Sequence, residues 1–124
     1  MHFRYARHTD DLLPLITFYT EIIGLKVLGS FENHSQYDGV FLGDGKSDWH
    51  LEFTQSMDDA NHHPDEDDLL VFYLDNEAER LHIVHLAKEA KISILKSKNP
   101  YWNQHGIVLL DPDGYGVVLA LKGI

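Results

Sequence analysis

Two apolar runs near the carboxyl end, residues 106–110 and 115–121, flank the tetrapeptide Asp-Pro-Asp-Gly at residues 111–114. Proline in the second position of a β-turn already has the required φ angle, and glycine in the fourth position allows the chain to reverse. The segment therefore predicts a β-hairpin. Residues 39–43 and 49–54 form an earlier pair of apolar runs. Because each pair follows a helix-like stretch, the chain is predicted to contain two copies of one βαβββ unit.

The first half of the chain contains a strong helix signal. Asp11 can cap the free N–H groups of a first turn, and apolar residues recur at helical spacing from Leu12 to Ile23. Gly24 is suited to end this helix, because glycine tolerates the conformation that follows a helix terminus. The predicted strands of this half are residues 2–7, 25–31, 39–43 and 49–54.

The second half repeats the order of the first. Residues 69–74 are apolar on both faces, as expected of a buried strand. Asp75 and Asn76 then precede a helical pattern that runs from about Glu77 to Ala90. A short strand at residues 92–95, a loop at residues 96–105 and the closing hairpin complete the predicted elements.

A polar, acidic stretch separates the two halves. The chain of 124 residues is predicted to form one domain of the α+β class, with mixed sheets and strand–helix–strand–strand–strand occurring twice. Residues 55–68 lack any periodicity and are predicted to be a linker. The predicted domain spans residues 1–124, with module 1 at about 1–54, the linker at about 55–68 and module 2 at about 69–124.

Composition and charge exclude several classes of partner. The formal net charge is −10, from 20 acidic against 10 basic residues, so nucleic acid and anionic membranes would be repelled. Apolar runs are too short to span a bilayer, and no secretory leader is visible. The absence of cysteine excludes disulfides and thiolate chemistry. A cytoplasmic location is therefore expected.

Three motifs together resemble the vicinal oxygen chelate superfamily. They are Asp11 with Phe18-Tyr19 and Gly24-Leu25, the tripeptide His50-Leu51-Glu52, and Asp-Pro-Asp-Gly at residues 111–114. This superfamily includes glyoxalase I, extradiol dioxygenases, and the fosfomycin-resistance and bleomycin-resistance proteins. The resemblance covers essentially the whole chain. It implies two βαβββ modules whose curved, mixed sheets enclose a cavity, and it implies a homodimer.

The resemblance also implies four metal-ligand positions on the cavity face, which fall here on Arg4, Glu52, Leu69 and Val118. A guanidinium has no lone pair for a metal, and leucine and valine have no donor atom. One carboxylate does not hold a catalytic divalent ion, since three protein ligands are usual for zinc. We therefore expect no metal cofactor at the family position.

Arg4 and Glu52 are expected to face each other, because the first and fourth strands of a module are neighbours in this fold. The guanidinium could then take the place of the metal's charge and pair with the carboxylate. In the functional interpretation, Arg4 also binds an anionic or carbonyl-bearing ligand. In the structural interpretation, the pair only satisfies two half-buried charges.

The predicted cavity wall combines polar and aromatic residues from both halves. Tyr101, Trp102 and His105 precede the final hairpin, where a flat ligand could stack on them, although Trp102 could equally fill a gap between modules or subunits. The residues predicted to bind the ligand are Arg4, His50, Glu52, Tyr73 and Trp102.

A displaced metal site is the alternative. His2 and His50 are predicted on the same faces as Arg4 and Glu52. Imidazole and carboxylate groups from His2, His50 and Glu52 would suit zinc, nickel or iron.

Three functions follow from these observations. The first is a metal-independent small-molecule-binding protein that resembles bleomycin-resistance proteins, whose cationic ligands would suit the acidic charge. The second is a metal-dependent lyase or dioxygenase with a displaced metal site. The third is a dimeric interaction domain without a small ligand. The sequence does not decide whether the protein is an enzyme, and it does not identify the ligand.

Overall fold

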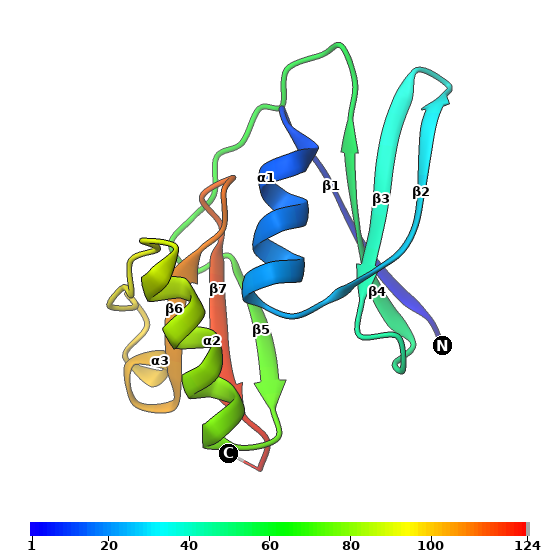
Figure 1. Cartoon of the computed structure of the whole chain (residues 1–124). Helices are drawn as coiled ribbons and strands as arrows, with labels where there is room; N and C mark the ends of the chain where they lie inside the picture. Colours follow the sequence, from blue (N-terminus) through cyan, green and yellow to red (C-terminus); the bar gives the residue numbers. More distant parts are fainter. Residues whose placement is uncertain (124) are drawn as a thin grey trace. The chain divides into compact units, whose positions relative to one another are not determined.

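The computed structural model describes residues 1–123, which divide into two compact units, one at residues 1–62 and one beginning at residue 63. Figure 1 shows the elements of both units in sequence colours. Unit 1 contains β1 (Phe3–His8), α1 (Leu12–Thr17), the π-helical turn η1 (Phe18–Ile22), β2 (Lys26–His34), β3 (Tyr37–Gly43) and β4 (Trp49–Gln55). Unit 2 contains β5 (Leu69–Leu74), α2 (Glu77–Glu89), α3 (Pro100–His105), β6 (Gly106–Leu110) and β7 (Gly116–Leu121).

Both units have a mixed sheet whose first strand is parallel to its last, which confirms the predicted α+β class with a repeated module. The sheet of unit 1 has the order β1-β4-β3-β2, with β1 parallel to β4 and the remaining pairs antiparallel. The sheet of unit 2 has the order β5-β7-β6, with β5 parallel to β7 and β6 antiparallel to β7. In each unit the first strand therefore lies beside the last.

In unit 1, α1 and η1 together span the predicted helix, which begins after Asp11 and ends before Gly24. Asp11 accepts a hydrogen bond at 3.2 Å from the N–H of Leu13 and so satisfies an otherwise unpaired donor. Gly24 follows η1 with a φ of +92°, a conformation that few other residues adopt. Tyr19 stacks on Phe53 of β4 at 5.2 Å between ring centroids, and both rings are fully buried. Burial of such a ring contributes roughly 1.5–3 kcal/mol to folding.

The closing hairpin of unit 2 confirms the turn prediction. The Asp111 carboxylate accepts hydrogen bonds from the N–H groups of Asp113 at 2.9 Å and Tyr115 at 3.1 Å. Gly114 has a φ of +90°, which explains why glycine is needed at the fourth position. The side chain of Asn76 caps α2 by accepting from the N–H of Glu79. Within residues 1–123, no helix has both the length and the apolar character needed to cross a bilayer.

Two predictions for unit 2 were wrong. The strand expected at residues 92–95 is reduced to a single bridge between Leu95 and Val108 of β6, in the position that β2 takes beside β3 in unit 1. The loop expected at residues 96–105 contains α3. Asn99 accepts from the N–H of Tyr101 and Pro100 occupies the first turn, so this helix has both a cap and a favourable first residue.

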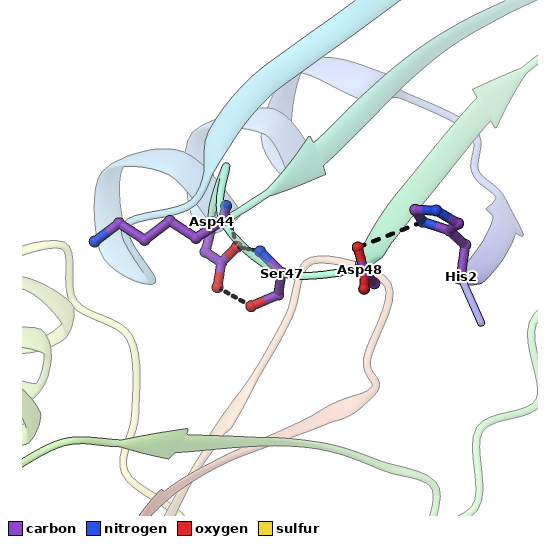
Figure 2. A network of polar contacts seen from close by, with 5 residues as sticks. His2, Asp44, Ser47 and Asp48 are labelled. Atoms are coloured by element: carbon purple, nitrogen blue, oxygen red, sulfur yellow. Dashed lines mark hydrogen bonds and ion pairs between the residues drawn. The ribbon is translucent and has the colours of Figure 1, made fainter.

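The connection between β3 and β4 is held by one carboxylate, as Figure 2 shows. Asp44 accepts a hydrogen bond from the Ser47 hydroxyl at 2.6 Å and from the N–H groups of Lys46 and Ser47 at 2.8 Å each. These bonds, the Ser47 hydroxyl first, stabilise the ionised form and lower the pKa of Asp44 from its ordinary value of 3.8. The bonds therefore stabilise the fold above the ordinary pKa, and this contribution is lost as pH falls through the lowered value.

We expect Ser47→Ala to raise the pKa of Asp44 toward 3.8, because the variant removes the hydroxyl bond that contributes most to the shift. A ¹³C NMR titration of the Asp44 carboxyl measures this directly. Ser30→Ala, at an exposed position on β2, is the matched control and should leave the titration unchanged. An Asp44 carboxyl that titrates identically in the wild type and Ser47→Ala would contradict the assignment.

Candidate functional site

The two faces of the unit 1 sheet have different chemistry because side chains alternate along each strand. On β4, Leu51 and Phe53 are buried on the side of α1 and η1, and α1 packs against β3 and β4. His50 and Glu52 therefore lie on the opposite face, which we call the helix-free face. Arg4 of β1 is the register partner of His50, and Phe41 of β3 is the partner of Glu52.

Arg4, His50 and Glu52 form one cluster on this face, which we call the Arg4 cluster. Nε of Arg4 donates a hydrogen bond to Nε2 of His50 at 2.8 Å. Nη1 of Arg4 lies 3.5 Å from Oε1 of Glu52, so the predicted ion pair is present. The guanidinium carbon also lies 4.9 Å from the centroid of the Phe41 ring, within the range of a cation–π contact. Three neighbours therefore fix the position of the guanidinium.

The charge of Arg4 is balanced within the cluster by Glu52 and not by His50. A guanidinium has only donors, so Nε2 of His50 is the acceptor in its hydrogen bond with Arg4. Guanidinium groups remain protonated in proteins. Glu52 is therefore the carboxylate that balances the charge of Arg4 within the cluster.

Arg4 and Glu52 differ in their exposure to solvent. The Arg4 side chain is 50% exposed, whereas the Glu52 side chain is 15% exposed. An ion pair with one half-exposed member at 3.5 Å contributes at most about 1 kcal/mol to stability. The pair therefore adds little to the fold, and it leaves the guanidinium accessible on the helix-free face.

An apolar surface adjoins the cluster, and the sequence did not indicate it. Leu28, Phe31 and Phe41 form this surface, which we call the aromatic patch; the rings of Phe31 and Phe41 lie 5.7 Å apart. Gly39 is the register partner of Phe31, whose ring occupies the space that a Cβ at residue 39 would need. A Cβ at residue 43 would lie 2.8 Å from Cδ1 of Leu28. Glycines at positions 39 and 43, on either side of Phe41, are the signal that could have revealed the patch.

The alternative metal site is not assembled. His2 pairs with Asp48 at 3.7 Å at the beginning of β4, as Figure 2 shows, and both side chains are exposed. Across residues 1–123, no three histidine, aspartate or glutamate side chains are grouped so as to hold a metal ion. His2 lies beside Asp48 and apart from His50 and Glu52, so the alternative site of His2, His50 and Glu52 stays a prediction.

Tyr73 and Trp102, the other two predicted ligand-binding residues, lie in unit 2. Tyr73 of β5 is 51% exposed and pairs with Ala120, two positions after the Val71–Val118 pair. It therefore shares a sheet face with Val118. A Cβ at Gly106 would lie 2.5 Å from Val118 and 3.1 Å from the Trp102 ring, so half-buried Trp102 lies against the same face. Their part in a cavity wall stays a prediction.

Comparisons with known proteins identify relatives along the whole chain. The YycE-like N-terminal domain family matches residues 3–54, and the YycE-like C-terminal domain family matches residues 67–120. The chain is 42% identical over 123 residues to the uncharacterized protein YycE of Bacillus subtilis (strain 168). That match covers 98% of this chain and 88% of the relative.

Solved structures share the fold. A crystal structure of Bacillus subtilis YycE matches with a TM-score of 0.89 and 41% identity, and the match covers 99% of this chain and 91% of that chain. That protein is described as one of unknown function and as a candidate glyoxalase/fosfomycin resistance protein. The trypanothione-dependent glyoxalase I of Leishmania major matches with a TM-score of 0.74 and 25% identity over 96% and 84% of the respective chains. TnmS3, an antibiotic binding protein from Streptomyces sp. CB03234, matches with a TM-score of 0.70 and 16% identity, and the match covers 98% of this chain and 94% of that chain. At this identity the likeness shows the fold alone.

We expect Gly39→Ala to destabilise the protein by about 1–3 kcal/mol, because the new methyl group meets the Phe31 ring and forces the aromatic patch to move. Urea denaturation measures the change. Gly29→Ala is the matched control, since its Cβ would meet only Phe41 at 3.5 Å, an ordinary contact, and should leave stability unchanged or slightly raised. Equal stability of Gly39→Ala and the wild type would show that the patch is not packed as described.

Proposed function

Because the chain belongs to the YycE-like family of the vicinal oxygen chelate superfamily, we propose that it is a metal-independent small-molecule-binding protein. The binding surface in this proposal is the helix-free face of unit 1. The Arg4 cluster supplies the polar contacts and the aromatic patch supplies the apolar ones.

The observation that carries the proposal is the position of Arg4. A charged side chain fixed by Phe41, His50 and Glu52 but still half exposed has little effect on stability. Its remaining N–H groups are strong donors for a ligand acceptor, and binding sites combine such donors with apolar walls. The adjoining aromatic patch, with Leu28 49% exposed, supports the same conclusion.

The donor chemistry supports metal independence. In this superfamily the ligand positions correspond to Arg4, Glu52, Leu69 and Val118, and only Glu52 carries a metal-binding atom. Arg4 also brings a positive charge to the location where a cation would bind, and like charges close together repel. The residues present therefore do not fit a divalent ion at that position.

Fragment binding to chelator-treated protein tests this function. We expect some fragments to shift the NMR amide signals of β1, β3 and β4 around Arg4. Phe41→Ala should weaken the binding of these fragments several-fold, because it removes apolar surface from the aromatic patch. Leu81→Ala, which removes an exposed apolar side chain from α2, is the control and should bind like the wild type. Adding zinc, nickel, manganese or iron(II) should not change affinity. If the protein retains one metal ion per chain and fragments bind only when that ion is present, metal independence is overturned.

We also propose that the chain forms a homodimer. The edge strands of unit 1 carry exposed apolar side chains, with Phe3 of β1 63% exposed and Val27 of β2 54% exposed. Such surface favours association, because burial removes it from water. Light scattering coupled to size-exclusion chromatography should give twice the chain mass of 14.2 kDa at micromolar concentration. A mass of one chain at every concentration tested would exclude the dimer.

A further inference from the structure

We propose that the helix-free face binds a flat small molecule that carries a carboxylate directly on its ring system. The carboxylate pairs with the Arg4 guanidinium, and the ring lies on the aromatic patch. This inference rests on the proposed function, and it names the chemical class of the ligand.

The charges of the face favour an anionic group. Arg4 presents the more exposed charge of the cluster, at 50% exposure against 15% for Glu52. Its hydrogen bond at 2.8 Å goes to the imidazole of His50, and its carboxylate contact in the cluster, to Glu52, is longer, at 3.5 Å. The guanidinium charge is therefore only partly balanced. A ligand carboxylate can accept from the remaining N–H groups, which take no part in these two contacts.

The shape of the face favours a flat apolar body. Phe31 lies across Gly39 and Leu28 lies across Gly43, so both side chains lie along the sheet instead of standing away from it. The rings of Phe31 and Phe41 are tilted by 46° to one another, so a flat aromatic ring system can stack on one of them while it meets the other at an angle. Both contacts bury apolar surface.

The spacing of the two parts limits the length of the ligand. The guanidinium carbon of Arg4 lies 4.9 Å from the centroid of the Phe41 ring, and Phe41 lies 5.7 Å from Phe31. The charged and apolar surfaces therefore share Phe41 as their boundary. A molecule whose carboxylate is joined to its ring by a single bond reaches both, and a long flexible linker is not required.

The net charge of −10 does not reverse this preference. Screening at physiological salt reduces the field of charges more than roughly 8–10 Å away, so the nearest groups decide which ligand binds. A cationic ligand would need Glu52, which is the less exposed member and already faces Arg4. The acidic surface slows the arrival of an anion more than it weakens the bound state.

Three probes with the same ring and different charge test the inference. They are 2-naphthoate, 2-naphthamide and 2-naphthylmethylammonium, titrated into the ¹⁵N-labelled full chain with amide shifts as the readout. We expect 2-naphthoate to shift the signals around Arg4 and Phe41 and to bind about tenfold more tightly than the ammonium probe, with the amide between them. Arg4→Gln should lower the affinity for 2-naphthoate about tenfold.

Two further variants control for charge and folding. Lys88→Gln removes one positive charge from an exposed position on α2 and should leave all three affinities unchanged. Arg4→Lys keeps the charge without the guanidinium geometry and should retain part of the preference for 2-naphthoate. The amide spectrum of each variant shows whether it is folded. A folded Arg4→Gln variant that binds 2-naphthoate as well as the wild type overturns the role of Arg4.

The outcomes separate this inference from the proposed function. Equal binding of all three probes at the helix-free face overturns the carboxylate preference and leaves small-molecule binding in place. Tighter binding of the ammonium probe overturns it in favour of a cationic ligand. If no probe binds this face at millimolar concentration, the ligand class is overturned, and the fragment experiment then decides the proposed function separately.

Discussion

The alternation of side chains along β4 is the constraint on which unit 1 depends. Leu51 and Phe53 are buried beneath the helix, and this burial fixes the register of the strand, because a slip of one residue would expose both. His50 and Glu52 alternate with these two residues, so they lie on the other face. The parallel partner β1 then brings Arg4 beside His50. The apolar core thus determines the position of the polar cluster.

Much of this fold could be predicted because its signals are local. A cap at Asp11, a helix end at Gly24 and the turn that begins at Asp111 each depend on residues within a few positions. The cap at Asn99 and the proline at position 100 are equally local, yet the sequence pattern predicts a loop at residues 96–105, where the structure has α3. With only six residues, α3 is too short to show the apolar periodicity that marks a longer helix.

The site could be predicted only in part, because contacts between distant strands are not visible in one sequence. The Arg4–Glu52 pair followed from the strand order that the resemblance implied. The aromatic patch did not, since it requires Phe31 to face Gly39 and the register of β2 to shift between Val27 and Gly29. That shift brings Leu28 onto the same face as Phe41. Nothing within β2 itself indicates where such an irregularity falls.

The parallel pairing of β1 with β4 also has a consequence for the order of folding. β2, β3 and β4 follow one another closely along the chain and can pair through short loops, whereas Arg4 and His50 are separated by 46 positions. Closing the longer loop costs more chain entropy, so β1 is expected to dock after the other three strands have met. The Arg4 cluster would then be among the last features of unit 1 to form. A partly folded intermediate would contain the aromatic patch but lack the guanidinium that gives the face its charge.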